Sequence, residues 1–195
     1  KMKAELQNGS IGEVARASLT AGQWLPDWKP KQNHKESYSA KAELGGGVGW
    51  DLIHEYDMAR YLFGEFTKAV SMHGNFPELE IDSPAVVNVL LSTAISTPLV
   101  SLQLDYVART PIRRYEIVGS KGTMVFDLPS KELYIENLSS KKLLTNDAED
   151  FSVENTYKIA MKEFLKCVER NTPTQQSIHE GLKSVQLVLQ SRNNQ

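Results

Sequence analysis

The sequence is poor in cysteine, in long apolar runs and in excess charge of either sign. Its single cysteine, Cys167, excludes an internal disulfide and a multi-cysteine metal cluster, and such a chain is expected in a reducing, cytoplasmic setting. No apolar run approaches the ~20 residues of a membrane-spanning helix, and residues 1–5 lack the apolar stretch of a secretory signal. The 22 basic and 24 acidic side chains nearly balance, which argues against a nucleic-acid partner. We therefore expect a cytoplasmic protein that binds neither nucleic acid nor a membrane.

What the sequence does contain is the composition of an ordinary globular protein. Its 195 residues are 41% hydrophobic and 24% charged, which suits one large domain over residues 1–195. The first residues predict about two helical turns, which carry Met2 and Leu6 and end at Asn8-Gly9. Because a domain seldom opens in mid-helix, we interpret residues 1–12 as the end of a linking helix and the chain as the downstream part of a longer protein. A frayed terminal helix is the alternative.

The middle of the chain alternates between apolar and polar residues, and its ends have helical periodicity. Alternation predicts strands, with a hairpin turn over residues 119–122, at residues 66–72, 85–93, 100–106, 112–118, 123–128 and 133–136. Apolar stripes predict two closing helices, with Tyr157, Met161, Phe164 and Val168 on the first and Ile178, Leu182, Val185 and Leu189 on the second. Strands grouped in the middle with helices at the ends predict an α+β fold with a mainly antiparallel sheet.

A glycine run followed by a strong helix is the most informative segment. Residues 45–49 are Gly-Gly-Gly-Val-Gly, without the preceding strand that a dinucleotide-binding loop needs, and they are interpreted as backbone that passes close to another group. The helix is expected over residues 51–63 and ends at Gly64. It has an apolar stripe at Leu52, Tyr56, Ala59 and Phe63, and a polar face at Asp51, His54, Asp57 and Tyr61.

His54 is the strongest candidate for chemistry. It lies three residues from Asp51 on one side and from Asp57 on the other, a spacing that brings helical side chains within reach of each other. An imidazole beside a carboxylate suits general acid–base catalysis. A satisfied polar helix face is an equal alternative. A metal site on the same three residues, as in a metal-dependent hydrolase, is less favoured because no second ligand cluster is evident. The other three histidines, His34, His73 and His179, are expected to be structural or on the surface.

A polar loop precedes the glycine run. Residues 22–41 contain two prolines and little periodicity, so no regular element is predicted. Long loops in compact domains are often functional. Trp24 and Trp28 in this loop either anchor it or line a site.

The segment from Gly45 to Glu65, with the sequence GGGVGWDLIHEYDMARYLFGE, resembles the signature of the Gfo/Idh/MocA oxidoreductases. Residues 8–14, 114–123 and 157–167 are also similar to segments of that family. The resemblance implies a two-domain enzyme that uses NAD or NADP on sugars or cyclitols. Its first domain is a Rossmann domain that binds the cofactor, and its second is an open sheet with helices on one face. Only the second is present in this sequence, which has no strand–GxGxxG–helix unit and no Glu-Lys-Pro segment with the family's lysine.

The resemblance also implies roles for individual residues. His54 matches the active-site histidine and Asp57 follows it as usual. Asp51 is a partial match to a second catalytic residue: many members place this aspartate four residues before the histidine, where this chain has Trp50, and a shorter variant resembles the spacing found here. Gly46 and Gly47 would let the backbone approach the substrate or the nicotinamide, and they are the candidates for cofactor binding. The residues expected to contact substrate are Trp24, Trp28, Lys35, Tyr38, Lys41, Asp57 and Arg114. For Arg114, and its neighbour Arg113, pairing with a nearby carboxylate is an equal alternative.

The function expected from the sequence is therefore that of a substrate-binding and histidine-bearing domain of a sugar dehydrogenase, inactive without its Rossmann domain. The alternative is a free-standing dimerisation or small-ligand-binding module without catalysis. Val86, Leu90, Val87 and Val89 place apolar side chains on both faces of one strand, which favours a homo-oligomer formed through the open face of the sheet.

Overall fold

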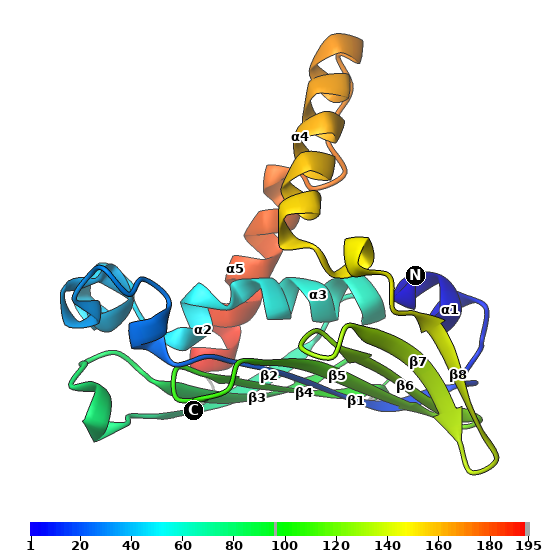
Figure 1. Ribbon diagram of the computed structural model, residues 1–195, viewed down its shortest axis with the longest axis horizontal. Coiled ribbons are helices and arrows are strands. Elements are labelled where there is room, and N and C mark those ends of the chain that lie inside the picture. The colour runs from blue at the N-terminus through cyan, green and yellow to red at the C-terminus, as the bar shows by residue number, and fades with distance from the viewer. Residues whose placement is uncertain (96, 194–195) are drawn as a thin grey trace.

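The computed structural model describes residues 1–95 and 97–193, and its centre is one eight-stranded sheet (Figure 1). The strands lie in the order β2-β3-β4-β1-β5-β6-β7-β8. Their bounds are β1 Val14–Gly22, β2 Lys68–Gly74, β3 Val86–Ser92, β4 Leu99–Asp105, β5 Ile112–Gly119, β6 Gly122–Asp127, β7 Glu132–Asn137 and β8 Ser140–Thr145. All neighbouring strands are antiparallel except β1 and β4. The predicted α+β class and mainly antiparallel sheet are confirmed.

Two strands were not predicted. β1 lies in the middle of the sheet, parallel to β4 and antiparallel to β5. Its inward side chains are Ala17, Leu19 and Ala21, all nearly inaccessible, but two alanines give only a weak apolar alternation. β8 is an exposed strand at the edge of the sheet and is rich in lysine. The predicted hairpin joins β5 to β6, with Gly119 opposite Gly122.

The helices all lie on one face of the sheet, as Figure 1 shows. They are α1 Met2–Gln7, α2 Val48–Asp51, α3 Ile53–Phe63, α4 Val153–Arg170 and α5 Ile178–Asn193. Apolar side chains of α3 and α5, such as Tyr56, Ala59 and Val188, pack with the inward residues of the strands in a single core. Among the described residues no helix covers the opposite face, where Met72 of β2 and Leu90 of β3 are 76% and 52% exposed. No helix in the described part of the chain is both long and apolar enough to span a bilayer.

The helix predicted over residues 51–63 is two helices. α2 ends at Asp51, Leu52 has φ −102° and ψ 28°, and α3 begins at Ile53. The break at Leu52 changes the direction of the chain between Asp51 and His54. The two side chains therefore do not have the spacing that one continuous helix would give them.

The centre of α3 is fastened to α5 by a buried guanidinium. Arg60 donates hydrogen bonds to Ser184 Oγ at 2.7 Å and to the Glu180 carbonyl at 3.0 Å, and it pairs with the carboxylates of Glu65, Glu180 and Asp57. Hydrogen bonds to several acceptors compensate the desolvation of a buried charge. Arg60 therefore holds α5 against α3.

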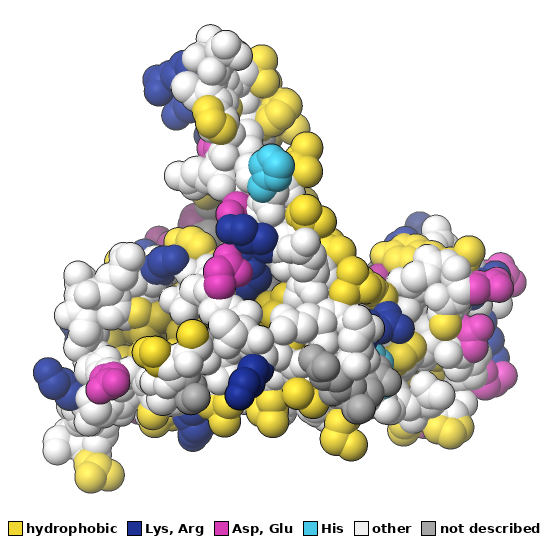
Figure 2. Space-filling view, turned by 180° about the vertical axis from the view of Figure 1, so that it is seen from behind, with side chains coloured by type: hydrophobic (Ala, Val, Ile, Leu, Met, Phe, Trp, Pro, Cys, Tyr) yellow, Lys and Arg dark blue, Asp and Glu magenta, His cyan; other side chains and the backbone are white. Residues whose placement is uncertain are grey.

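α4 projects away from the rest of the structure (Figure 1). None of its residues is buried, and its predicted apolar stripe is present but open to solvent, with Tyr157 74% and Val168 63% exposed. Figure 2 shows hydrophobic side chains along one edge of this projection, which continue towards the body of the molecule.

Residues 22–41 form a separate lobe beside α2 and contain no strand or α-helix beyond the last residue of β1, as predicted. Short 3-10 turns shape the lobe, and they begin at Leu25, His34 and Tyr38. A further 3-10 turn at Ala42–Leu44 leads from this lobe into the glycine run.

Candidate functional site

A cavity of about 200 Å³ lies where the beginning of α3 meets the end of β1 and the start of β5. Most of its wall is apolar, and three of its polar side chains, those of His54, Glu55 and Arg113, lie next to one another. The residues that line it are Ala21, Gly22, Gln23, Trp28, Leu52, His54, Glu55, Pro111, Ile112, Arg113, Leu128 and Pro129. An apolar hollow with a few convergent polar groups is the usual form of a small-molecule site.

Glu55 is the buried charge of this cavity. Its side chain is 0% exposed, and it lies 2.7 Å from Arg113 Nε through Oε1. The Tyr115 hydroxyl donates a hydrogen bond to the other oxygen, Oε2. Burial, and then the neighbouring Glu55 charge, raise the pKa of Tyr115, so this hydroxyl remains a donor at neutral pH.

His54 is half exposed on the cavity wall, with Nε2 3.3 Å from Glu55 Oε1. The helical spacing predicted Asp51 or Asp57 as its carboxylate neighbour, and this was wrong: the neighbour is Glu55. The reason is the break at Leu52, which separates Asp51 from α3, together with the rival partners of Asp57.

Asp57 lies in the contact between α3 and α5 and not on the cavity wall. Its carboxylate accepts hydrogen bonds from Ser184 Oγ at 2.6 Å and from Arg60 at 3.3 Å. The substrate role expected for Asp57 gains no support from this position.

Asp51 belongs to a second polar cluster, with two tyrosines. The Tyr106 hydroxyl donates to Asp51 Oδ2 at 2.6 Å. Burial and this hydrogen bond raise the pKa of Tyr106, and burial and the Asp51 charge raise that of Tyr38. The structure thus brings together two predicted site residues, Asp51 and Tyr38, although neither is in contact with His54.

The two tryptophans of the 22–41 lobe have different positions. Trp28 lines the cavity, and its ring meets Tyr106 edge-on at 5.3 Å between centroids. Trp28 therefore connects the cavity with the Asp51 cluster. Trp24 is buried, with the guanidinium of Arg109 stacked 3.4 Å from its ring centroid, and it anchors the lobe. Of the two roles predicted for these tryptophans, Trp28 therefore lines the site and Trp24 anchors the lobe.

Three other candidates lie away from the cavity. Lys35 pairs with Glu80 at 2.7 Å. The backbone carbonyl of Lys41 accepts a hydrogen bond from Gly46 at 2.9 Å, within the turn before the glycine run. Arg114 pairs with Asp127 at 2.7 Å. Successive strand residues point to opposite faces, so Arg113, and not Arg114, reaches the cavity.

Gly46 and Gly47 are required by the fold of the chain itself. A Cβ atom on Gly46 would lie 2.2 Å from the carbonyl oxygen of Tyr38, and Gly47 has a φ of +119° that side-chain-bearing residues avoid. The close approach predicted for this run is confirmed, but the group approached is the backbone of residues 38–41. The cofactor contact expected of these glycines stays a prediction.

Glu55 and Tyr115 were not predicted as residues of the site. Position 55 lies on the same helix face as Leu52, Tyr56 and Ala59, so a glutamate there interrupts an apolar stripe. Tyr115 follows Arg113 by two residues, which places both side chains on the helix-covered face of β5. A charged residue within an apolar stripe was the available signal.

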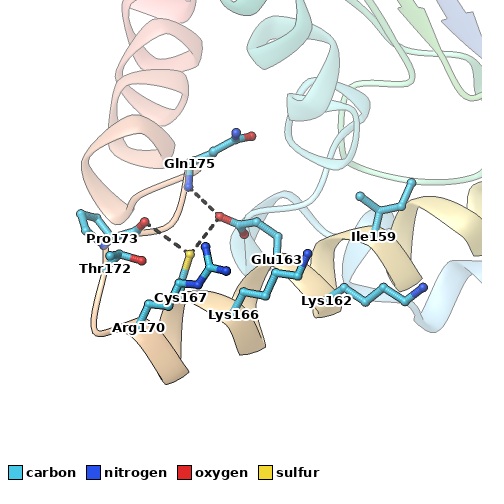
Figure 3. Close-up of a pocket in the computed structure, with 9 residues that line it drawn as sticks. All are labelled: Ile159, Lys162, Glu163, Lys166, Cys167, Arg170, Thr172, Pro173 and Gln175. Carbon is cyan, nitrogen blue, oxygen red and sulfur yellow. Dashed lines mark hydrogen bonds between the residues drawn. The ribbon is translucent and has the colours of Figure 1, made fainter.

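A larger cavity, of about 450 Å³, lies at the outer end of α4 (Figure 3). Glu163 Oε1 accepts a hydrogen bond from the backbone of Gln175 at 2.9 Å and lies 3.4 Å from Cys167 Sγ. These contacts hold the connection between α4 and α5 in place. Within residues 1–95 and 97–193 no three His, Cys, Asp or Glu side chains gather as metal ligands would.

The eight-stranded, mostly antiparallel open sheet with helices on one face is the architecture of the C-terminal domain of a class of oxidoreductases. The family model described as the GFO/IDH/MocA C-terminal domain matches residues 1–125. The chain therefore belongs to the Gfo/Idh/MocA family. A comparison with curated proteins gave no match.

Solved structures share this fold at low sequence identity. A levoglucosan dehydrogenase in complex with NADH and levoglucosan matches with a TM-score of 0.82 and 18% identity, over 99% of this chain and 60% of that one. An oxidoreductase from Agrobacterium radiobacter in complex with NAD+, L-tartaric acid and magnesium matches with a TM-score of 0.77 and 17% identity. The match covers 100% of this chain and 59% of that one. An oxidoreductase from Thermotoga maritima has a TM-score of 0.78 and 16% identity, over 99% of this chain and 55% of that one. The chain thus spans somewhat more than half the length of these neighbours.

The packing role of Gly46 can be tested by Gly46→Ala. Because the new methyl group would collide with backbone carbonyls, we expect a loss of about 1–3 kcal/mol in the free energy of unfolding, measured with urea. Gly181→Ala is the control, since a Cβ there meets nothing within 4 Å, and it should leave stability equal or slightly raised. Unchanged stability of the Gly46 variant would contradict the packing role.

Proposed function

We propose that this chain is the substrate-binding part of an NAD(P)-dependent dehydrogenase, with a sugar or a cyclitol as substrate and His54 as the proton carrier. The single observation that carries the proposal is the half-exposed imidazole on the wall of a mostly apolar cavity, beside the paired charges of Glu55 and Arg113. The family and the fold are those of oxidoreductases, and one structural neighbour holds levoglucosan together with NADH.

The cavity fits a small polar ligand with apolar faces. Its volume, about 200 Å³, is below the range of sites that enclose drug-sized molecules, about 300–1,000 Å³. A sugar ring can stack one face on Trp28 while its hydroxyl groups meet Gln23, His54 and Arg113. A whole dinucleotide exceeds this space, so its binding falls to the Rossmann domain that we propose as the other part of the protein.

The chain's own residues have defined tasks in this scheme. His54 takes the proton of the substrate hydroxyl during oxidation, or returns it during reduction. Arg113, whose side chain is 31% exposed, donates hydrogen bonds that orient the substrate. Trp28 and Leu52 exclude water from one side. The nicotinamide, when bound, supplies the hydride acceptor or donor.

His54→Asn in the complete protein tests the proposal. We expect kcat to fall by a factor on the order of 10²–10⁴, because the amide cannot accept the hydroxyl proton. Steady-state kinetics with a panel of sugars and both cofactors measures the effect.

His179→Asn is the matched control, since His179 lies exposed in the first turn of α5, and it should keep the activity of the unsubstituted protein. A folded His54 variant, verified by circular dichroism, that also keeps this activity would contradict the assignment.

The exposed stripe of α4 suits contact with the proposed Rossmann domain. Val153, Tyr157, Met161, Phe164 and Val168 are each more than half exposed, and a patch of this kind marks an interface. The lysines of α4 lie on its other side, as Lys158, Lys162 and Lys166 follow one another at four-residue intervals. One face of α4 is thus apolar and the opposite face is solvated.

Hydrogen exchange measures this contact. In the isolated chain the amides of α4 should exchange fast, because none of its residues is buried. In the complete protein we expect them to slow by about tenfold or more, since roughly 1.4 kcal/mol of protection gives that factor. The amides of α3, which are packed in both forms, are the internal reference. Equal exchange of α4 in the two forms would rule out the contact.

We also propose that the protein is a cytoplasmic homo-oligomer that pairs through the open face of its sheet. Val70, Met72, Leu90 and Leu99 form an exposed apolar patch on β2, β3 and β4, on the face that no described helix covers. Burial of such a patch between two copies removes it from water.

Sedimentation of the complete protein tests this pairing. Leu90→Glu places a charge in the patch, so we expect the sedimentation coefficient to shift towards that of a smaller species. Leu138→Glu, at the fully exposed turn between β7 and β8, is the control and should leave the assembly unchanged. An unaffected assembly in the Leu90 variant would show that the interface lies elsewhere.

A further inference from the structure

The carboxylate of Glu55 has an incomplete set of hydrogen bonds. Oε2 accepts from the Tyr115 hydroxyl. Oε1, which is buried, lies close to two nitrogens, Arg113 Nε and His54 Nε2, but neither aligns with it well enough to form a hydrogen bond. A buried acceptor without a donor is unfavourable. A donor already within contact distance therefore gains by turning towards Oε1.

Arg113 has less freedom to do so than His54. The Arg113 Nε–H donates to the Tyr115 hydroxyl at 3.0 Å, and the guanidinium is more buried than the imidazole. The His54 ring is half exposed and its Nε2 already lies 3.3 Å from Oε1, so rotation of the ring can direct Nε2–H at Oε1. This favours the neutral tautomer that carries its hydrogen on Nε2.

We propose that Glu55 is a positioning residue for His54: it holds the Nε2–H tautomer and leaves the lone pair of Nδ1 as the site that exchanges a proton with the substrate hydroxyl. This role rests on the proposed function of His54. When the hydroxyl proton moves to Nδ1, the ring becomes an imidazolium beside a buried carboxylate. The charge of Glu55 then stabilises the charge that the reaction creates on His54.

Arg113 and Tyr115 hold the carboxylate of Glu55 in place. The positive charge of Arg113 compensates the burial of Glu55, and the Tyr115 hydroxyl fixes Oε2, so that Oε1 is held towards His54. The residues come from two elements, α3 and β5, whose packing sets the geometry. Asp51 and Asp57 take no part, because each has its own partners.

The experiment is nitrogen-15 NMR of the histidine rings in the isolated chain, which needs no catalytic activity. The nitrogen shifts report which ring nitrogen carries the hydrogen. We expect the Nε2–H form of His54 in the unsubstituted chain, and a larger share of the Nδ1–H form in Glu55→Gln, where the charge is removed but the shape is kept. Glu116→Gln is the control, since Glu116 pairs with Arg16 on the open face, and it should leave the His54 signals unchanged.

Two further variants keep the test decisive. If Glu55→Gln does not fold, Glu55→Asp retains the charge but withdraws it from the ring, and the same shift towards Nδ1–H is expected. Tyr115→Phe removes only the bond to Oε2 and should keep more of the Nε2–H form than either Glu55 variant. Signals of His54 that are indifferent to every Glu55 substitution would overturn the proposal.

Kinetics of the complete protein give a second, separate measurement. If Glu55 acts through His54, the double variant Glu55→Gln with His54→Asn should be no slower than His54→Asn alone. Independent, multiplicative losses would overturn the positioning role. Should the NMR result hold while His54→Asn retains turnover, the positioning of His54 would stand and the proposed function would fail.

Discussion

The ion pair between Glu55 and Arg113 is the contact on which the geometry of the site depends. It joins the first turn of α3 to the start of β5, and the fully buried carboxylate of Glu55 could not be left unpaired there without a large desolvation penalty. Because the pair is fixed, the start of α3 cannot shift along the sheet, and the cavity beside it keeps its shape. The position of the half-exposed imidazole of His54, one residue before Glu55, therefore depends on this ion pair.

The fold was largely predictable because it follows from periodicity. The strands from β2 to β7 and the helices α3, α4 and α5 all have repeated apolar spacing, and the structure confirms them within a few residues. β1 escaped prediction because a central strand here uses alanine where it packs beneath α3. β8 escaped because an edge strand with lysines has almost no apolar signal. Propensity and periodicity are both weak where packing uses small residues.

The site was predictable only in part, and the reason is the break at Leu52. A continuous helix would have placed Asp51 and His54 on one face. The residues around Leu52 contain no helix-breaking signal that would predict the turn between them. Arg114, and not Arg113, was predicted to contact the substrate for a similar reason. The sequence does not show which face of the sheet a strand residue points to until the register of the strand is known. His54 and Trp28 were found because their signals, an imidazole after a glycine run and an aromatic ring in a long loop, do not depend on register.

The central place of β1 has a consequence for how the protein is made. β4 and β5 are consecutive along the chain, yet β1, which precedes both in the sequence, lies between them and pairs with both. The β4 edge of this strand cannot be paired until residue 105 has left the ribosome, and the β5 edge cannot be fully paired until residue 119 has. Until then β1 has unpaired backbone groups on at least one edge, a state that invites pairing with other chains. Long-range pairings of this kind also slow folding, so the unpaired edges of β1 stay open for longer in a newly made chain.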